Sequence, residues 1–216
     1  MTRLQIKADV RYLLFSEIYY KLEEPKAKRK AFAILESTIQ CLAKKGFEGV
    51  TLEMIAREAA VTRPLIKYYF NDLDDLIISA IKFIRLFFQK FVVDQMMRER
   101  DEVRMLERYA KACFQWTDIY KSHSQVWLAF LHRCTRSKSE RALNTIAVQV
   151  GEQRLSELLA QGKEKGLFRH ENSAQTAKII QTLITGAMVT VNAEDFDDPA
   201  AFADLICAQC LSLASK

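Results

Sequence analysis

The sequence contains little glycine and proline, with six and three of these residues among 216. Chains built from short strands use such residues in their turns, and no alternating apolar run bounded by turn clusters stands out. Apolar residues instead recur at helical spacing throughout, and 50% of the chain is hydrophobic. The scarcity of turn residues therefore disfavours a sandwich or barrel and predicts an all-α protein with a sizeable core.

Long uncharged apolar runs are also missing, and none approaches the roughly 18 residues that a membrane helix needs. No charged and apolar leader opens the chain, so we expect neither a membrane span nor a signal peptide. Five cysteines, an odd number, fit a reducing cytoplasm. Cys207 and Cys210 have no second metal-binding pair nearby, so we interpret them as buried helix residues rather than a redox or metal site.

Catalytic patterns are equally scarce. We find no Ser/His/Asp set, phosphate loop or paired carboxylates, and His123, His132 and His170 lie in separate segments. We therefore expect no enzyme, no metal and no cofactor.

Charge is distributed unevenly along the chain. Residues 1–70 contain 13 Lys and Arg against 8 Asp and Glu, whereas residues 71–216 contain 19 of each. The net charge of +5 therefore comes entirely from the first third of the chain. This asymmetry is typical of a protein that meets a polyanion at one end, although an excess of this size also occurs on ordinary solvated surfaces.

Apolar stripes at helical spacing predict the secondary structure. Helices are expected over residues 7–22, 26–45, 51–59, 62–70 and 72–98, and then over 103–121, 124–134, 140–165, 173–192 and 199–214. Gly46 follows the second stripe, where a left-handed residue would end a helix. We interpret residues 7–22 as an additional helix that docks on the same or a partner subunit.

The stretch TLEMIAREAAVTRPLIKYYF, residues 51–70, contains two short helical patterns separated by a few residues. Thr51 is a favourable N-cap for the first pattern. The second begins at Thr62, which places Pro64 in the first helical turn, where its missing N–H costs no intrahelical hydrogen bond. Pro64 is therefore predicted to start a helix and not to break one.

Two short helices joined by a tight turn and built on a preceding helix describe a helix-turn-helix, whose second helix enters the major groove of DNA. Arg63 and Lys67 lie four residues apart and share a helix face. An arginine there can pair with guanine, and Pro64 can contact a thymine methyl group. The alternative is that Arg63 and Lys67 form a solvated basic face.

At these residues the chain resembles the TetR family of bacterial transcriptional regulators. The resemblance is carried by Arg29–Phe47, Thr51, Ile55-Ala56, Ala59-x-Val61-Thr62, Tyr68-Tyr69-Phe70 and Leu76. It covers about fifty residues and implies an N-terminal three-helix DNA-binding unit followed by a larger C-terminal helical ligand-binding and dimerisation domain. The implied boundaries are 1–25 for an N-terminal extension, 26–70 for the DNA-binding domain and 71–216 for the rest.

Three positions depart from the family pattern. Ala60 stands in the turn where glycine is common, Leu73 replaces a frequent lysine, and Lys67 occupies a position that is often tyrosine. Because alanine tolerates the left-handed region poorly, we expect a tighter or differently shaped turn. The lysine at position 67 partly offsets the positive charge absent at position 73.

The resemblance also implies site residues. The positions expected to face DNA are Thr51, Thr62, Arg63, Pro64, Lys67 and Tyr69. Tyr68 and Phe70 are assigned to the core. A ligand pocket between the later helices is implied near Phe87, Phe91, Trp116, Tyr120, Trp127, Phe130 and His132, although aromatic stripes are more often core.

The last two predicted helices suggest a dimer surface. It would be formed by Ala177, Ile180, Ile184, Gly186, Ala187, Val191, Leu205, Ile206 and Leu213, unless these residues are buried within one subunit. A two-fold dimer would present paired recognition helices to a palindromic operator in double-stranded DNA.

The sequence thus predicts a cytoplasmic, dimeric, sequence-specific transcription regulator, a repressor that a small apolar or amphipathic effector releases from DNA. The alternative is an architectural or cell-division-linked DNA-binding protein without a small-molecule switch. Activation is the alternative mode of regulation to repression.

Overall fold

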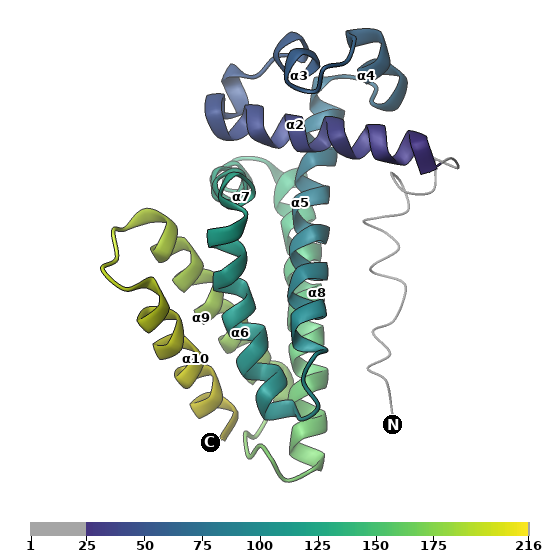
Figure 1. The fold of residues 1–216 in the computed structure, drawn as a ribbon. Coiled ribbons are helices and arrows are strands. Elements are labelled where there is room, and N and C mark those ends of the chain that lie inside the picture. The colour runs from purple at the N-terminus through teal and green to yellow at the C-terminus, as the bar shows by residue number, and fades with distance from the viewer. Residues whose placement is uncertain (1–24, 216) are drawn as a thin grey trace. The chain divides into compact units, whose positions relative to one another are not determined.

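A computed structural model describes residues 25–215, so the helix expected over residues 7–22 and the extension 1–25 lie almost entirely outside it. The described residues form helices and turns without a strand, which confirms the all-helical prediction (Figure 1). The helices are α2 (Pro25–Gly49), α3 (Leu52–Glu58), α4 (Arg63–Tyr69), α5 (Leu73–Met96), α6 (Glu102–Ile119), α7 (Lys121–Cys134), α8 (Lys138–Glu164), α9 (Ser173–Ala193) and α10 (Pro199–Ser215). Most ends lie within three residues of the predicted ones, and Gly46 has the expected positive φ of 72°.

The chain folds into two compact units. Within the described residues, the first unit contains residues 25–87 and 122–133, and therefore combines α2, α3, α4 and the first part of α5 with most of α7. The second contains residues 88–121 and 134–215, which include the end of α5 together with α6, α8, α9 and α10.

In the first unit α3 packs against both α2 and α4 (Figure 1). Ile34 and Leu35 from α2, Ile55 from α3 and Ile66 from α4 are fully buried. Burying an aliphatic side chain of this size contributes about 1.5–3 kcal/mol, so these contacts dominate over any single polar contact. The helix-turn-helix is thus built on the apolar face of α2.

The first unit also includes α7, which is distant in the sequence. The Ser122 hydroxyl donates to Oε1 of Gln40 on α2 at 2.9 Å, and Nε2 of His123 lies 3.4 Å from Oε1 of Glu36. The His123 ring lies among half-buried phenylalanines of α5, 5.7 Å from the ring centre of Phe87. These contacts attach a later helix to the side of α2.

The turn between α3 and α4 contains a left-handed alanine. Ala60 has a φ of 51°, and it is the only non-glycine residue with positive φ among the described residues. The backbone N–H of Val61 donates to the Ala56 carbonyl at 2.9 Å and that of Ala60 donates to the Arg57 carbonyl at 3.2 Å, which defines a Schellman ending. The turn therefore keeps the left-handed residue despite the missing glycine, contrary to the different turn shape that we expected.

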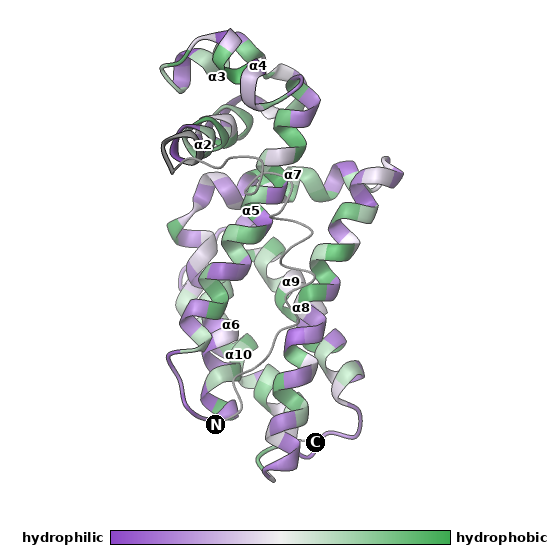
Figure 2. Cartoon of the chain, turned by 90° about the vertical axis from the view of Figure 1, so that its right-hand side faces the viewer, coloured by the Kyte–Doolittle hydropathy of each residue, from purple (hydrophilic) through white to green (hydrophobic). Residues whose placement is uncertain are grey.

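In the second unit, α6, α8, α9 and α10 pack side by side. Tyr109 of α6 donates a hydrogen bond to Oε1 of Gln181 on α9 at 2.8 Å, beside Gly151 of α8. A Cβ at position 151 would lie 2.7 Å from that oxygen, so a larger residue there would displace the end of the Gln181 side chain. Figure 2 shows apolar and hydrophilic residues on every helix, as expected of amphipathic helices that share a core.

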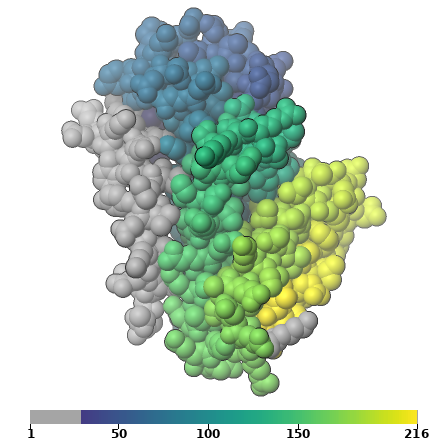
Figure 3. Space-filling view, turned by 180° about the vertical axis from the view of Figure 1, so that it is seen from behind, coloured from purple at the N-terminus to yellow at the C-terminus, as the bar shows by residue number. Residues whose placement is uncertain are grey.

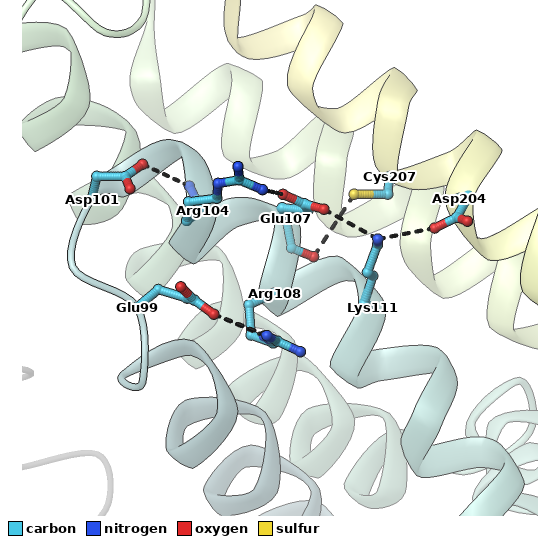
Figure 4. A network of polar contacts seen from close by, with 8 residues as sticks. All are labelled: Glu99, Asp101, Arg104, Glu107, Arg108, Lys111, Asp204 and Cys207. Atoms are coloured by element: carbon cyan, nitrogen blue, oxygen red, sulfur yellow. Dashed lines mark hydrogen bonds and ion pairs between the residues drawn. The ribbon is translucent and has the colours of Figure 1, made fainter.

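Polar contacts fix α10 to α6 (Figure 4). The ammonium of Lys111 on α6 lies 3.1 Å from both Glu107 on the same helix and Asp204 on α10. The hydrogen bond from Lys111 lowers the pKa of Glu107, and its bonds to Asp204 and Glu107 raise the pKa of Lys111. The Cys207 thiol donates to the Glu107 carbonyl at 3.8 Å, so one face of α10 is held against α6.

The residues predicted to form a dimer surface lie on α9 and α10, and these two helices lie side by side on the surface of the second unit (Figure 3). Several of them are buried within the single chain, namely Ala177, Ile180, Ile184, Ala187 and Ile206. Their assignment to a dimer surface is wrong, because these side chains are already buried within one subunit, which was the alternative. Leu205 is 55% exposed, and Ile179, which was not predicted to belong to the dimer surface, is 47% exposed.

All five cysteines are buried, as predicted for Cys207 and Cys210. Burial raises the pKa of Cys210 to about 12 and also raises the pKa of Cys207, so both thiols stay neutral. Among the described residues no group of three or more His, Cys, Asp or Glu could hold a metal ion. No helix of the described part is long and apolar enough to cross a membrane.

The strain at Ala60 gives a first prediction. A left-handed alanine costs about 1–2 kcal/mol, and glycine removes this strain. Because glycine also raises the conformational entropy of the unfolded chain, part of the gain is lost, and Ala60→Gly should stabilise the protein by about 0.5–1 kcal/mol. Ala59 is the matched control, because its φ of −81° is unstrained and Ala59→Gly should destabilise the fold. Denaturant unfolding followed by circular dichroism measures both. Equal changes in the two variants would contradict the strain argument.

Candidate nucleic-acid interface

The two short helices start in different ways. Thr51 is extended (φ −132°), and its hydroxyl oxygen accepts a hydrogen bond from the Met54 N–H at 3.3 Å, which confirms the predicted N-cap of α3. Thr62 is also extended, but its side chain makes no capping bond to α4. Pro64 stands in the first turn of α4, as predicted, so it begins the helix.

The phase of α4 determines which side chains reach solvent. Ile66 and Phe70, four residues apart, are buried, with exposures of 0% and 4%. The exposed positions are Arg63, Pro64, Lys67 and Tyr68. Arg63 and Lys67 are four residues apart, as are Pro64 and Tyr68, so each pair is adjacent on the helix surface. The half-buried ring of Tyr69 contacts that of Tyr68 edge to face, with centroids 5.0 Å apart.

Tyr68 corrects the sequence analysis. We predicted that it belongs to the core together with Phe70, but Tyr68 is 77% exposed. The buried pair of Ile66 and Phe70 rotates position 68 outward by about half a turn. That signal was present in the sequence, because Pro64 and Tyr68 are also four residues apart and therefore lie on one face.

Ion pairs distinguish the basic residues of this face. Nη1 of Arg63 lies 2.5 Å from Oε1 of Glu53 on α3, with side-chain exposures of 51% and 57%. Lys67 is exposed and has no ion-pair partner within the described part of the chain. At the far end of α3, Glu58 pairs with Lys44 of α2 at 3.2 Å. The face therefore presents one paired arginine and one unpaired lysine.

The predicted ligand-pocket residues are divided between the two units. Phe87, Trp127, Phe130 and His132 belong to the first unit, whereas Phe91, Trp116 and Tyr120 belong to the second. Trp116, Trp127 and Phe130 are buried, whereas His132 is exposed.

In the second unit these aromatics form one group. The Phe91 ring centre lies 5.8 Å from that of Tyr120, and the Trp116 centre lies 6.4 Å from Tyr120 and 5.0 Å from Phe88. A pocket lined by Phe91, Trp116 and Tyr120 remains a prediction.

Two short helices, joined by a tight turn and packed on a third, define the helix-turn-helix class of DNA-binding folds. Residues 34–80 match the bacterial regulatory proteins of the tetR family, and residues 102–213 match the C-terminal domain of BetI-type transcriptional repressors. The second match alone covers more than half of the chain, so the chain belongs to the tetR family with a BetI-type C-terminal domain. This is a family of transcription regulators and not of enzymes.

Individual relatives are distant. The HTH-type transcriptional regulator BetI of Agrobacterium fabrum is 25% identical over 114 residues, which cover 53% of this chain and 55% of that protein. The chain thus matches only about half the length of this relative.

Two solved structures share the fold. The fatty acid degradation regulator FadR of Bacillus halodurans has a TM-score of 0.69 at 20% identity, over 88% of this chain and 96% of that one. AibR, solved in complex with isovaleryl coenzyme A and operator DNA, has a TM-score of 0.63 at 16% identity, over 86% and 98% of the two chains.

The two threonines give a matched prediction. Thr51→Ala removes the cap of α3 and should lower the free energy of unfolding by about 0.5–2 kcal/mol. Thr62→Ala removes a hydroxyl that caps nothing and should change stability by less than about 0.5 kcal/mol. Thermal and denaturant unfolding measure both variants. An equal loss in the two would show that the Thr51 bond to Met54 does not stabilise α3.

Proposed function

We propose that this chain is a dimeric, sequence-specific DNA-binding repressor whose α4 enters the major groove. The observation that carries this proposal is the exposed surface of α4, which combines Arg63, Pro64, Lys67 and Tyr68, while Ile66 and Phe70 are buried. A groove about 12 Å wide admits one helix, and this face has the donors and apolar surface that base edges require.

Each side chain has a chemical role on DNA. The guanidinium of Arg63 can donate to O6 and N7 of a guanine, and Pro64 can pack on a thymine methyl group. The ammonium of Lys67 suits a phosphate, as do the hydroxyls of Thr51, Thr62 and Tyr69. Tyr68 extends the same face and is added to the predicted set.

The proposed dimer uses the outer face of α9 and α10. A shallow apolar groove on α9 is lined by Gln175, Lys178, Ile179, Thr182 and Leu183. Leu205 of the neighbouring α10 is also exposed. Two exposed apolar side chains on adjacent helices support a helix-on-helix contact with a second copy, which would place two copies of α4 on a palindromic operator.

An effector that releases the repressor from DNA is the finer part of the proposal. The BetI-type C-terminal domain supports it, and so does the structure of AibR with isovaleryl coenzyme A and operator DNA. The group of Phe91, Trp116 and Tyr120 in the second unit suits a small apolar or amphipathic ligand. Under the alternative, an architectural DNA-binding protein, no small molecule would release the operator.

Selective DNA binding tests the main proposal. Genomic fragments are selected with the full chain, and the tightest duplex is titrated with wild type, Arg63→Ala and Lys67→Ala. Losing a base contact at Arg63 should weaken binding by about 1–3 kcal/mol, whereas losing Lys67 should weaken all sequences and reduce the salt slope by about 0.9. Lys138→Ala, an exposed lysine of the second unit, is the control and should bind as wild type. Weak binding of wild type to every fragment would contradict the proposal. A duplex that is bound selectively serves to screen effectors.

The dimer prediction is separate. A buried charge at Leu205→Glu or Ile179→Glu should dissociate the dimer, because an unpaired carboxylate in an apolar interface costs several kcal/mol. Ile146→Glu on α8 is the control, since Ile146 is 41% exposed and lies outside the proposed face. Sedimentation measures the oligomer. A monomeric wild type, or equal dissociation by the α8 control, would contradict this surface.

A further inference from the structure

The two basic side chains on the exposed face of α4, Arg63 and Lys67, differ in whether a carboxylate pairs with them. The guanidinium of Arg63 is paired with Glu53, one helix earlier, at 2.5 Å. Lys67, one turn further along α4, has no ion-pair partner in the part of the chain that the structure describes. The sequence alone treats the two residues alike, as two positive charges on one face.

Pairing changes what Arg63 can contribute to DNA binding. Sequence-independent affinity comes from cations that neutralise phosphates and release counterions. An arginine whose charge is balanced by a neighbouring carboxylate adds no net positive charge, so it contributes little to that term. Its guanidinium still has five N–H donors, of which the recorded contact with Glu53 involves one nitrogen. Arg63 can therefore donate to a base edge while adding little to the general attraction for phosphates.

The pair is also accessible. Both side chains are more than half exposed, so the contact is solvent-screened and weak, and the guanidinium can rotate toward a base at small cost. The carboxylate further repels phosphates, which makes a backbone contact by Arg63 less favourable than a contact to a guanine edge.

We propose that Glu53 is a specificity-determining residue, which by pairing with Arg63 suppresses sequence-independent attraction to phosphate and keeps the guanidinium available for a base. Lys67 then supplies the phosphate contact. This inference rests on the proposed DNA-binding function and assigns different roles to two residues that share one helix face.

The test compares two glutamates of α3. Glu53→Gln breaks the pair with Arg63, whereas Glu58→Gln breaks the pair with Lys44 and changes the net charge by the same amount. Each protein is titrated with the selected operator duplex and with an unrelated duplex of equal length across a salt series. The release of one arginine should raise affinity for unrelated DNA about fivefold to tenfold at 0.1 M salt and steepen the salt slope by about 0.9.

Operator affinity should rise less than affinity for unrelated DNA, so the ratio of the two should fall several-fold in Glu53→Gln and stay within twofold in Glu58→Gln. In an Arg63→Ala background, Glu53→Gln frees no cation and should leave the salt slope unchanged. Thermal unfolding confirms that each variant is folded.

Equal effects of Glu53→Gln and Glu58→Gln would overturn the inference, because the change would then be one of overall charge. A steeper slope that persists in the Arg63→Ala background would overturn it as well. If the wild type prefers no fragment, the proposed function is refuted. The salt slopes of binding to unrelated DNA then still test the effect of the Glu53–Arg63 ion pair.

Discussion

The burial of Ile66 and Phe70 is the constraint on which the candidate interface depends. A helix as short as α4 is not stable alone in water, since isolated helices below about 12–15 residues are marginal. Its existence and its rotation therefore come from the two side chains that it buries, against the core formed with α2 and α3. Once this phase is fixed, positions 63, 64, 67 and 68 face solvent.

The turn before α4 shows how local strain is tolerated for the sake of that packing. Ala60 occupies the left-handed region where glycine would be unstrained, and its neighbours still make both Schellman hydrogen bonds. The apolar contacts of α3 and α4, each worth more than the strain, override the local preference. The strain at Ala60 is thus tolerated because the packing of α3 and α4 requires this turn.

Much of the fold could be predicted because its signals are local. Helix spans, the cap at Thr51, the initiating Pro64 and the left-handed Gly46 all depend on residues within a few positions of one another. The inclusion of α7 in the first unit could not be predicted, because it depends on contacts between side chains that are far apart in sequence, such as Ser122 and Gln40.

The errors have a common physical origin. The type of an apolar or aromatic residue does not reveal its rotation about the helix axis. Residue type alone therefore predicts Tyr68 in the core and Ile180 and Ile184 on a dimer surface, whereas Tyr68 is exposed and the two isoleucines are buried. On an amphipathic helix the rotation is decided by which neighbours pack first, and only the tertiary structure shows this for α9.

The contact between Glu53 and Arg63 belongs to the same non-local class, since the two residues lie on different helices across a strained turn. The first 70 residues carry only a modest positive excess, and pairing removes part of even that from the exposed face of α4. A regulator must distinguish one site from a large excess of others, so weak general attraction is an advantage when the donors for one base remain. A face that combines one balanced arginine with one unbalanced lysine separates these two requirements, because hydrogen-bond donors and net charge then come from different residues.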